Sequence, residues 1–208
     1  MNHFFRYYFS IIFTIIIISY MIIIVFINII QSTENNSNSV NNFGENTEFN
    51  DISEMSQYYF NGNFFWPVPG FHRITSPFGP RRSPTSGSSS NHSGIDIAAP
   101  EGTVIYSVIS GIVSFVGFKG AGGCTITTVA GNISVSYCHV SPNYIVSVGQ
   151  LINVGQQVGN VGPKVIYGIP NNPYRDSTGK PTNGATTGCH LHLTIRENGT
   201  PVNPLKFF

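Results

Sequence analysis

The feature that most constrains this chain is a series of short runs rich in β-branched and aromatic residues, bounded by glycine, proline or asparagine. Such runs predict β-strands, because these side chains pack well on a pleated, half-buried surface. No window between residues 58 and 208 shows a sustained 3.6-residue period, and the 22 glycines and 13 prolines of the chain suit tight turns. We therefore expect an all-β domain over residues 58–208, built as an antiparallel, sandwich-like sheet. The expected strands are residues 103–109, 112–118, 125–129, 133–138 and 191–195.

The sequence before this domain is of a different kind. Residues 11–30 are uncharged and strongly apolar, and a helix of this length, at about 1.5 Å per residue, spans a hydrocarbon core of about 30 Å. A secretory signal peptide is the competing interpretation, but it has a shorter apolar region and ends in an A-x-A-like cleavage site, which residues 28–33 do not offer. We expect a single transmembrane helix over residues 11–30. Because Arg6 precedes it and Glu34 is the first charge after it, we place residues 1–10 in the cytoplasm and the domain outside, facing the cell wall.

Residues 31–57 link the apolar stretch to the domain. They are rich in asparagine, serine and acidic residues, so they lack the apolar burial that offsets the entropy cost of ordering, and we expect a flexible linker. The domain that follows is mildly basic, which favours an anionic polymer such as a cell wall as its partner. Dense runs of lysine and arginine are missing from it, so we expect no nucleic-acid partner, and no pattern identifies a protein partner.

His92 and Asp96, in the segment NHSGID, form a candidate metal-binding pair. On a straight strand their Cα atoms would lie about 13 Å apart, too far to share one ion. The intervening Ser93 and Gly94 permit a bend. Such a bend would bring an imidazole and a carboxylate together, and zinc accepts both as ligands.

His190 and His192, in the segment CHLHL, lie two residues apart on an expected strand, so their side chains emerge on one face. Catalytic zinc uses three protein ligands and keeps a fourth position open. His92, Asp96 and one of these two histidines would complete such a set. The other histidine would then be catalytic.

Five segments, in this order, resemble the motifs of the lysostaphin-like (LytM-type) zinc endopeptidases, which have the form FGxRxxP, HxGxD, GTxV, YxH and TGxHLH. The chain has FGPRRSP at 78–84, HSGID at 92–96, GTV at 102–104, YCH at 137–139 and TGCHLH at 187–192. The resemblance covers residues 66 to about 205. It departs from the family pattern at Cys138 and Cys189, where alanine and proline are usual, and in a long stretch before the last motif.

The resemblance implies a zinc endopeptidase that hydrolyses peptide bonds of bacterial cell-wall peptidoglycan in a groove for extended peptide. It implies that His92, Asp96 and His192 hold Zn²⁺, and that His139 and His190 flank the zinc-bound water as the catalytic pair. Zinc lowers the pKa of bound water to about 7. Either catalytic histidine can then move the proton while the other stabilises the oxyanion, and the sequence leaves this choice open.

Two alternatives concern the role of such a domain. A catalytically silent module of the same fold, which binds wall polymer or activates a hydrolase, would have lost some of the five residues, and all five are present. A wall-opening component of a phage or of a conjugative apparatus would keep the same catalytic residues. A membrane anchor and a flexible linker, as expected for residues 11–30 and 31–57, would suit that role. The sequence does not separate this role from ordinary wall remodelling, and it does not name the bond that is cut.

Three cysteines and one long irregular stretch lead to further predictions. A hairpin with its loop at residues 130–132 would place Cys124 opposite Cys138 and allow a cross-strand disulfide. Cysteine catalysis is not expected, because Cys189 should face away from its neighbour His190. Residues 162–186 contain no strand signal and lead directly to the last motif. We expect a loop that borders the groove and selects substrate without supporting the fold.

Overall fold

The computed structural model describes residues 63–208, and its regular structure is all strand apart from two 3₁₀ turns, η1 (Gly120–Gly122) and η2 (Pro204–Lys206). The all-β prediction is confirmed for this part of the chain. Four predictions lie outside the described residues. They are the cytoplasmic segment 1–10, the transmembrane helix 11–30, the linker 31–57 and the start of the domain at residue 58. Between residues 63 and 208, no helix has the length and apolar character needed to span a membrane.

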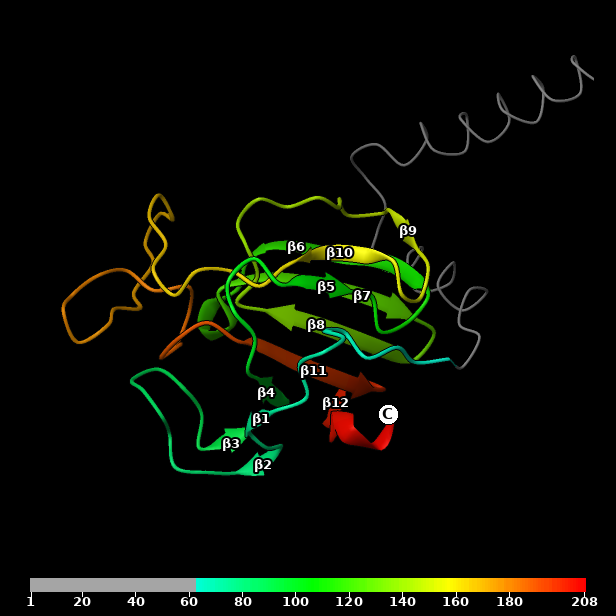
Figure 1. Ribbon diagram of the computed structural model, residues 1–208, viewed down its shortest axis with the longest axis horizontal. Coiled ribbons are helices and arrows are strands. Elements are labelled where there is room, and N and C mark those ends of the chain that lie inside the picture. The colour runs from blue at the N-terminus through cyan, green and yellow to red at the C-terminus, as the bar shows by residue number, and fades with distance from the viewer. Residues whose placement is uncertain (1–62) are drawn as a thin grey trace, which may run out of the picture. The chain divides into compact units, whose positions relative to one another are not determined.

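An eight-stranded antiparallel sheet forms the centre of the domain, in the order β1-β4-β11-β8-β7-β6-β9 with β12 paired to β11 (Figure 1). The strands are β1 (Ile74–Ser76), β4 (Ile95–Ile97), β6 (Gly111–Phe118), β7 (Cys124–Ala130), β8 (Ile133–Cys138), β9 (Leu151–Ile152), β11 (Leu191–Glu197) and β12 (Thr200–Val202). The long strands β6, β7, β8 and β11 are four of the five runs expected from the sequence. The fifth run, 103–109, contains a shorter strand, residues 104–106. The other short strands were missed, because two or three residues show no periodicity.

The two faces of this sheet differ in chemistry, as the alternation of strand side chains requires. On one face, Ile126 and Tyr137 are buried in a single apolar core. A ribbon of β5 (Val104–Tyr106) and β10 (Gln157–Asn160) packs against this core, where a Cβ added at Gly159 would lie 3.1 Å from Cδ1 of Ile126. The resulting two layers agree with the expected sandwich-like arrangement. The opposite face of the sheet is polar and carries the candidate site.

The β7–β8 hairpin has a register that differs by one residue from the expected one. Ala130 pairs with Ile133, which leaves a turn of two residues, and Thr125 lies opposite Cys138. Cys124 therefore belongs to the apolar core, whereas Cys138 lines the pocket on the polar face. All three cysteines are free. The expected cross-strand disulfide is wrong. A shift of one residue in the pairing turns every side chain to the other face of the sheet, so Cys124 and Cys138 lie on opposite faces.

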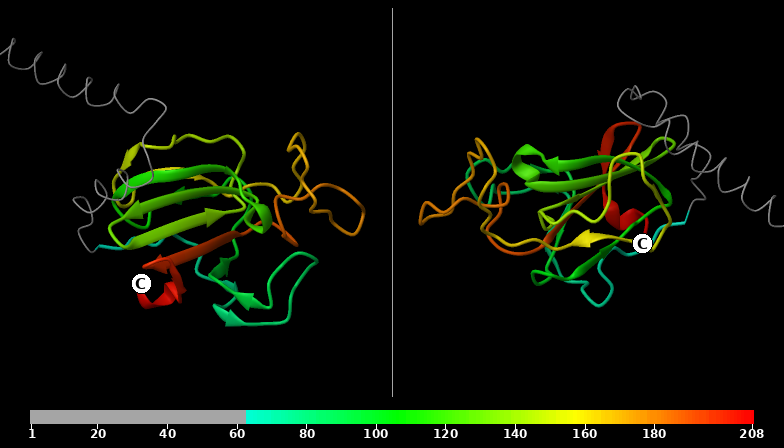
Figure 2. Two further views of the ribbon diagram at one scale, coloured as in Figure 1. Left: turned by 180° about the vertical axis from the view of Figure 1, so that it is seen from behind. Right: turned by 90° about the horizontal axis from the view of Figure 1, so that it is seen from above.

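Two long loops project from the same end of the sheet, where β11 begins (Figures 1 and 2). The first joins β2 (Gly79–Pro80) to β3 (Asn91–His92), which pair with each other, and the second is formed by residues 162–188. As expected, the second loop contains no named strand. The two loops meet, since a Cβ added at Gly87 would lie 2.7 Å from Cε1 of Tyr174.

Candidate metal centre and catalytic site

Neighbouring strands place Asp96 of β4 directly opposite His192 of β11 in the antiparallel register. Oδ1 of Asp96 lies 2.8 Å from Nδ1 of His192. His190 precedes the first residue of β11, and its Nε2 lies 3.4 Å from the same carboxylate oxygen. The register favours His192 over His190 as the third candidate ligand, because His192 joins the compact group formed with His92 and Asp96.

His92 reaches the same point because the chain bends at Ser93 and Gly94, as the sequence predicted. Its Nε2 lies 3.2 Å from Oδ1 of Asp96 and 2.9 Å from Nδ1 of His192. The bend requires glycine, because a Cβ at Gly94 would collide with the carbonyl oxygen of Leu193 on β11. Close approach of the two backbones, rather than a positive φ, explains this glycine.

The three converging atoms fit a zinc ion. They are Nε2 of His92, Oδ1 of Asp96 and Nδ1 of His192, with mutual separations of 2.8, 2.9 and 3.2 Å. Ligands of a tetrahedral zinc site lie about 2.0–2.1 Å from the metal, and hence about 3.3 Å from one another. Two imidazoles and one carboxylate are also a ligand set of catalytic zinc, with one position open for water.

Hydrogen bonds on the far side of each ligand fix its orientation, as is usual at metal sites. Nδ1 of His92 lies 2.8 Å from the carbonyl oxygen of Pro77, and Nε2 of His192 lies 2.9 Å from Oγ1 of Thr194. Each imidazole therefore has one nitrogen engaged by the protein and the other directed at the common point.

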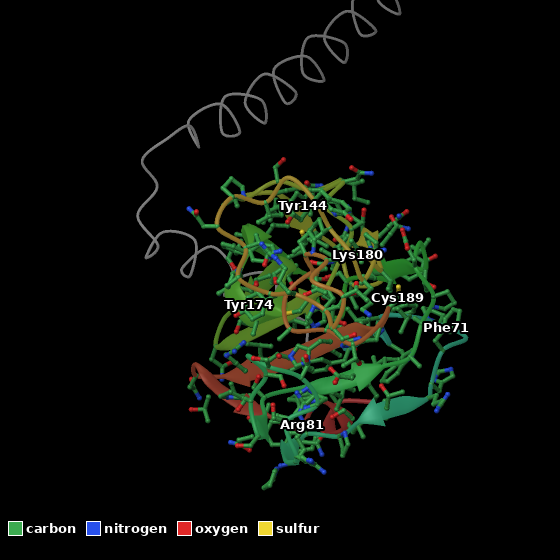
Figure 3. All side chains as sticks on the ribbon, turned by 90° about the vertical axis from the view of Figure 1, so that its left-hand side faces the viewer. Phe71, Arg81, Tyr144, Tyr174, Lys180 and Cys189 are labelled. Atoms are coloured by element: carbon green, nitrogen blue, oxygen red, sulfur yellow. The ribbon has the colours of Figure 1, made fainter. Side chains whose placement is uncertain are left out.

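Arg81 holds the remaining oxygen of Asp96. Its Nη1 donates to Oδ2 at 3.0 Å and to Oγ of Ser76 at 2.6 Å, so Oδ1 alone faces the histidines. Burial by itself would raise the pKa of Asp96, but hydrogen bonds with His190, His192 and His92 outweigh it and hold this pKa well below its usual range. Figure 3 looks onto the end of the sheet from which the loops project and shows Arg81 there. The motif FGPRRSP contained this residue, but the sequence alone gave it no role.

His139 and His190 lie side by side next to the three ligands, with ring centroids 4.7 Å apart. Nδ1 of His139 donates to the carbonyl of Asn183 at 2.6 Å, and Nδ1 of His190 lies 2.9 Å from the carbonyl of Gly188. Each ring thus has its Nε2 available to the site. Burial, together with the neighbouring His190 and His192, lowers the pKa of His139 to about 3. The structure therefore brings all five predicted residues into one cluster.

Asn183 is the residue that sequence reasoning missed. It is fully buried, and its side chain accepts from the amide of Cys124 at 2.7 Å and donates to the carbonyl of Val140 at 2.9 Å. These bonds tie the loop 162–188 to the start of β7 and to the segment that follows β8, next to His139. The expectation that this loop adds nothing to the fold is therefore wrong at its C-terminal end. The dipeptide Asn183-Gly184 gave only the signal of a turn.

An open pocket of about 400 Å³ surrounds this cluster. The first loop contributes Arg81 and Ser88, the second contributes Thr187, and the polar face of the sheet forms the floor. Cys189 is exposed and does not line the pocket, in agreement with its exclusion as a nucleophile.

An antiparallel β domain with a candidate His-Asp-His ligand set and two further histidines at an open pocket is typical of metal-dependent peptidases. Residues 90–171 match the profile of peptidase family M23. The chain carries an M23 peptidase domain of the lysostaphin type, and the resemblance found in its sequence is confirmed.

Relatives support this assignment. The chain is 35% identical over 137 residues to DD-carboxypeptidase/endopeptidase Mpg of Neisseria meningitidis, and 31% identical over 143 residues to peptidoglycan DD-endopeptidase ShyA of Vibrio cholerae. These matches cover 65% and 68% of this chain but only 27% and 29% of the relatives. The chain thus spans little more than a quarter of their length.

Solved structures share the fold. A zinc-containing peptidase from Vibrio cholerae superposes with a TM-score of 0.52 at 28% identity, over 70% of this chain and 39% of that one. The catalytic domain of lysostaphin from Staphylococcus simulans has a TM-score of 0.51 at 22% identity, over 74% of this chain and 96% of that domain. The second comparison concerns the fold alone.

Proposed function

We propose that this protein is a zinc-dependent endopeptidase that hydrolyses peptide bonds in bacterial peptidoglycan. The observation that carries the proposal is the convergence of one ligand atom each from His92, Asp96 and His192, with His139 and His190 beside them. The relatives named as peptidoglycan DD-endopeptidases suggest cross-links between stem peptides as the substrate.

A zinc ion held by His92, Asp96 and His192 would polarise the scissile carbonyl and lower the pKa of its bound water. The protein's own groups determine how protons move around it. Arg81 keeps Oδ2 of Asp96 occupied, so the carboxylate presents one oxygen to the ligand cluster. The carbonyls behind His139 and His190 orient both rings toward the open side.

The two catalytic histidines are suited to different roles in this proposal. His139 is buried and neutral, and because its Nδ1 donates to Asn183, its Nε2 lone pair is free to accept the proton of the attacking water. His190 is less buried and close to the carboxylate of Asp96. In its protonated form it would donate from Nε2 to the developing oxyanion.

The test uses the full-length chain, purified peptidoglycan and mass spectrometry of the released fragments, together with the zinc content per chain. We expect wild-type protein to contain about one zinc and to release shorter peptide fragments. His192→Ala should lose zinc and activity, whereas His139→Ala should keep zinc and lose about 10²–10⁴-fold in turnover. His72→Ala is the control, because His72 stacks on Trp66 away from the cluster. Zinc-loaded wild-type protein that releases no fragments would overturn the proposal.

The alternative of a catalytically silent module has no supporting observation here. Such a module needs neither a complete ligand set nor the backbone hydrogen bonds that direct Nε2 of His139 and His190 toward the site. The same fragment analysis separates the two functions, because a silent module binds peptidoglycan without changing its products.

We also propose that residues 11–30 anchor the chain in the membrane with residues 1–10 in the cytoplasm and the domain facing the wall. The support is the uncharged length of the segment and the position of Arg6. A role in opening the wall for a phage or a conjugative apparatus is compatible with this arrangement. Protease added to intact spheroplasts should remove the domain if it faces outward, and protection of the domain would contradict the proposal.

A further inference from the structure

A single aromatic ring connects two sides of the pocket at the end of the sheet from which the loops project. Tyr174, on the loop 162–188, lies against Gly87 of the first loop, since a Cβ added at Gly87 would be 2.7 Å from its Cε1. The hydroxyl of the same side chain lies next to Gly120 of η1, where an added Cβ would be 3.8 Å away. Figure 3 shows Tyr174 at this end of the domain. The ring therefore bridges the first loop and the turn between β6 and β7.

The bridge stands at the outer end of the pocket. The strand order places β11 and β8, which form the pocket floor, between β4 beyond the first loop and β7 beyond η1. The two residues that follow each bridged glycine are small and line the pocket; they are Ser88, Ser89, Ala121 and Gly122. Tyr174 itself does not line it. The small residues thus form two facing walls, and the ring closes the space between them at one end.

This closed end lies a short distance from the candidate catalytic residues. The carbonyl of Gly122 accepts from the backbone amide of His139 at 2.8 Å. Gly120 precedes Gly122 by two residues, so their Cα atoms lie at most about 7 Å apart. An extended peptide advances about 3.3 Å per residue. The groove therefore has room for about two to four substrate residues between the catalytic histidine and the ring of Tyr174.

Hydrogen bonds within its own loop hold Tyr174 in place. Its carbonyl accepts from the amide of Thr182 at 3.1 Å and from Nη1 of Arg175 at 2.8 Å. Oδ2 of Asp176, two residues further on, pairs with Nζ of Lys164 near the start of the loop at 3.5 Å. The two limbs of the loop are thus joined on both sides of the tyrosine. The ring is a fixed part of the groove.

We propose that Tyr174 determines substrate length, so that on one side of the scissile bond this protein accepts a segment of about two to four residues. The inference rests on the proposed peptidase function. A segment that continues further has to displace the ring from Gly87 and Gly120, and the hydrogen bonds of the loop oppose that movement. The aromatic ring, which fills the space between the two walls, is the barrier.

The test uses a soluble cross-linked stem-peptide dimer and two derivatives of it. Six alanines extend the stem on the acyl side of the scissile bond in one derivative and on the amine side in the other. Either extension adds about 20 Å and would pass Tyr174. For wild-type full-length chain we expect kcat/KM on one derivative to lie about tenfold or more below that on the other. Tyr174→Ala should bring this ratio near one, whereas Tyr174→Phe, which keeps the ring, should retain it.

Tyr167→Ala is the matched control, because Tyr167 is a tyrosine of the same loop and is 70% exposed. It should keep the wild-type ratio. Titration calorimetry of the three peptides with zinc-loaded His139→Ala, with and without Tyr174→Ala, measures the length limit without turnover. Weaker binding of one derivative that Tyr174→Ala relieves, with no turnover by wild type, would contradict the proposed function and support the limit. Equal rates and affinities for the three peptides, no binding of any, or a preference that persists in Tyr174→Ala overturns the limit.

Discussion

Asn183 connects the loop 162–188 to the candidate catalytic histidine His139, and its replacement tests whether this loop orients the site. Asn183→Ala leaves the amide of Cys124 and the carbonyl of Val140 without their buried partners. Each unsatisfied group costs about 1–3 kcal/mol, so we expect the free energy of unfolding to fall by about 2–6 kcal/mol for the two groups. A domain near the middle of the usual range, about 10 kcal/mol, stays folded after this loss.

The same change removes the side-chain bonds that hold residue 183 in place. Its backbone carbonyl, which accepts from Nδ1 of His139, is then no longer fixed in position. We expect kcat to fall about 10- to 100-fold, a part of what general acid–base catalysis contributes, while KM and zinc content stay near wild type. The measurements are steady-state kinetics on a cross-linked peptide and the ¹⁵N shifts of His139. The wild-type spectrum should show one tautomer with the proton on Nδ1, and the variant a mixture.

Asn172→Ala is the matched control for this prediction. Asn172 is a buried asparagine of the same loop, and its side chain bonds to the carbonyl of Thr182 at 2.8 Å and to the amide of Tyr174 at 3.0 Å. Its loss should destabilise the loop by a similar amount without touching His139. If both variants lose the same turnover at a temperature where both are folded, the orienting role of Asn183 is refuted.

Three further predictions follow from the site and the fold. Arg81→Ala should weaken zinc affinity about 10- to 100-fold in a competition with a chelator, with partial recovery in Arg81→Lys, and an unchanged affinity would show that Arg81 does not orient Asp96. Gly94→Ala should lower the free energy of unfolding by about 1–3 kcal/mol because its Cβ meets the carbonyl of Leu193, whereas Gly188→Ala, with open space around it, should not. Alkylation of the denatured chain without reductant should modify three thiols by intact mass, and fewer would reveal a disulfide.

The convergence of His92, Asp96 and His192 was predictable because the chemistry and spacing of these candidate ligands leave few solutions. His92 and Asp96 share one ion only if the chain bends between them, and Gly94 is the residue that permits the bend. The third ligand was open between His190 and His192, because that choice depends on which of them lies opposite Asp96 across two strands. Strand pairing joins residues that are far apart in the chain, and the local pattern of a single sequence does not specify which residues pair.

Errors occurred where a one-residue difference or a tertiary contact decides the structure. The hairpin register differed by one residue from the expected one, and this moved Cys124 to the core and Cys138 to the pocket. Asn183 has the signature of an ordinary turn residue, and only the packing of its loop against β7 and the segment after β8 reveals its two buried hydrogen bonds. Local patterns carry no information about either outcome.

The most direct test of the account is X-ray absorption at the zinc edge of the full-length chain. The account predicts a first shell of nitrogen and oxygen at about 2.0–2.2 Å, with multiple scattering from two imidazoles, and its disappearance in His192→Ala. Sulfur scattering at about 2.3 Å would show that a cysteine holds the metal. That result, or a chain that binds no zinc, would contradict the assignment of His92, Asp96 and His192 as the zinc ligands.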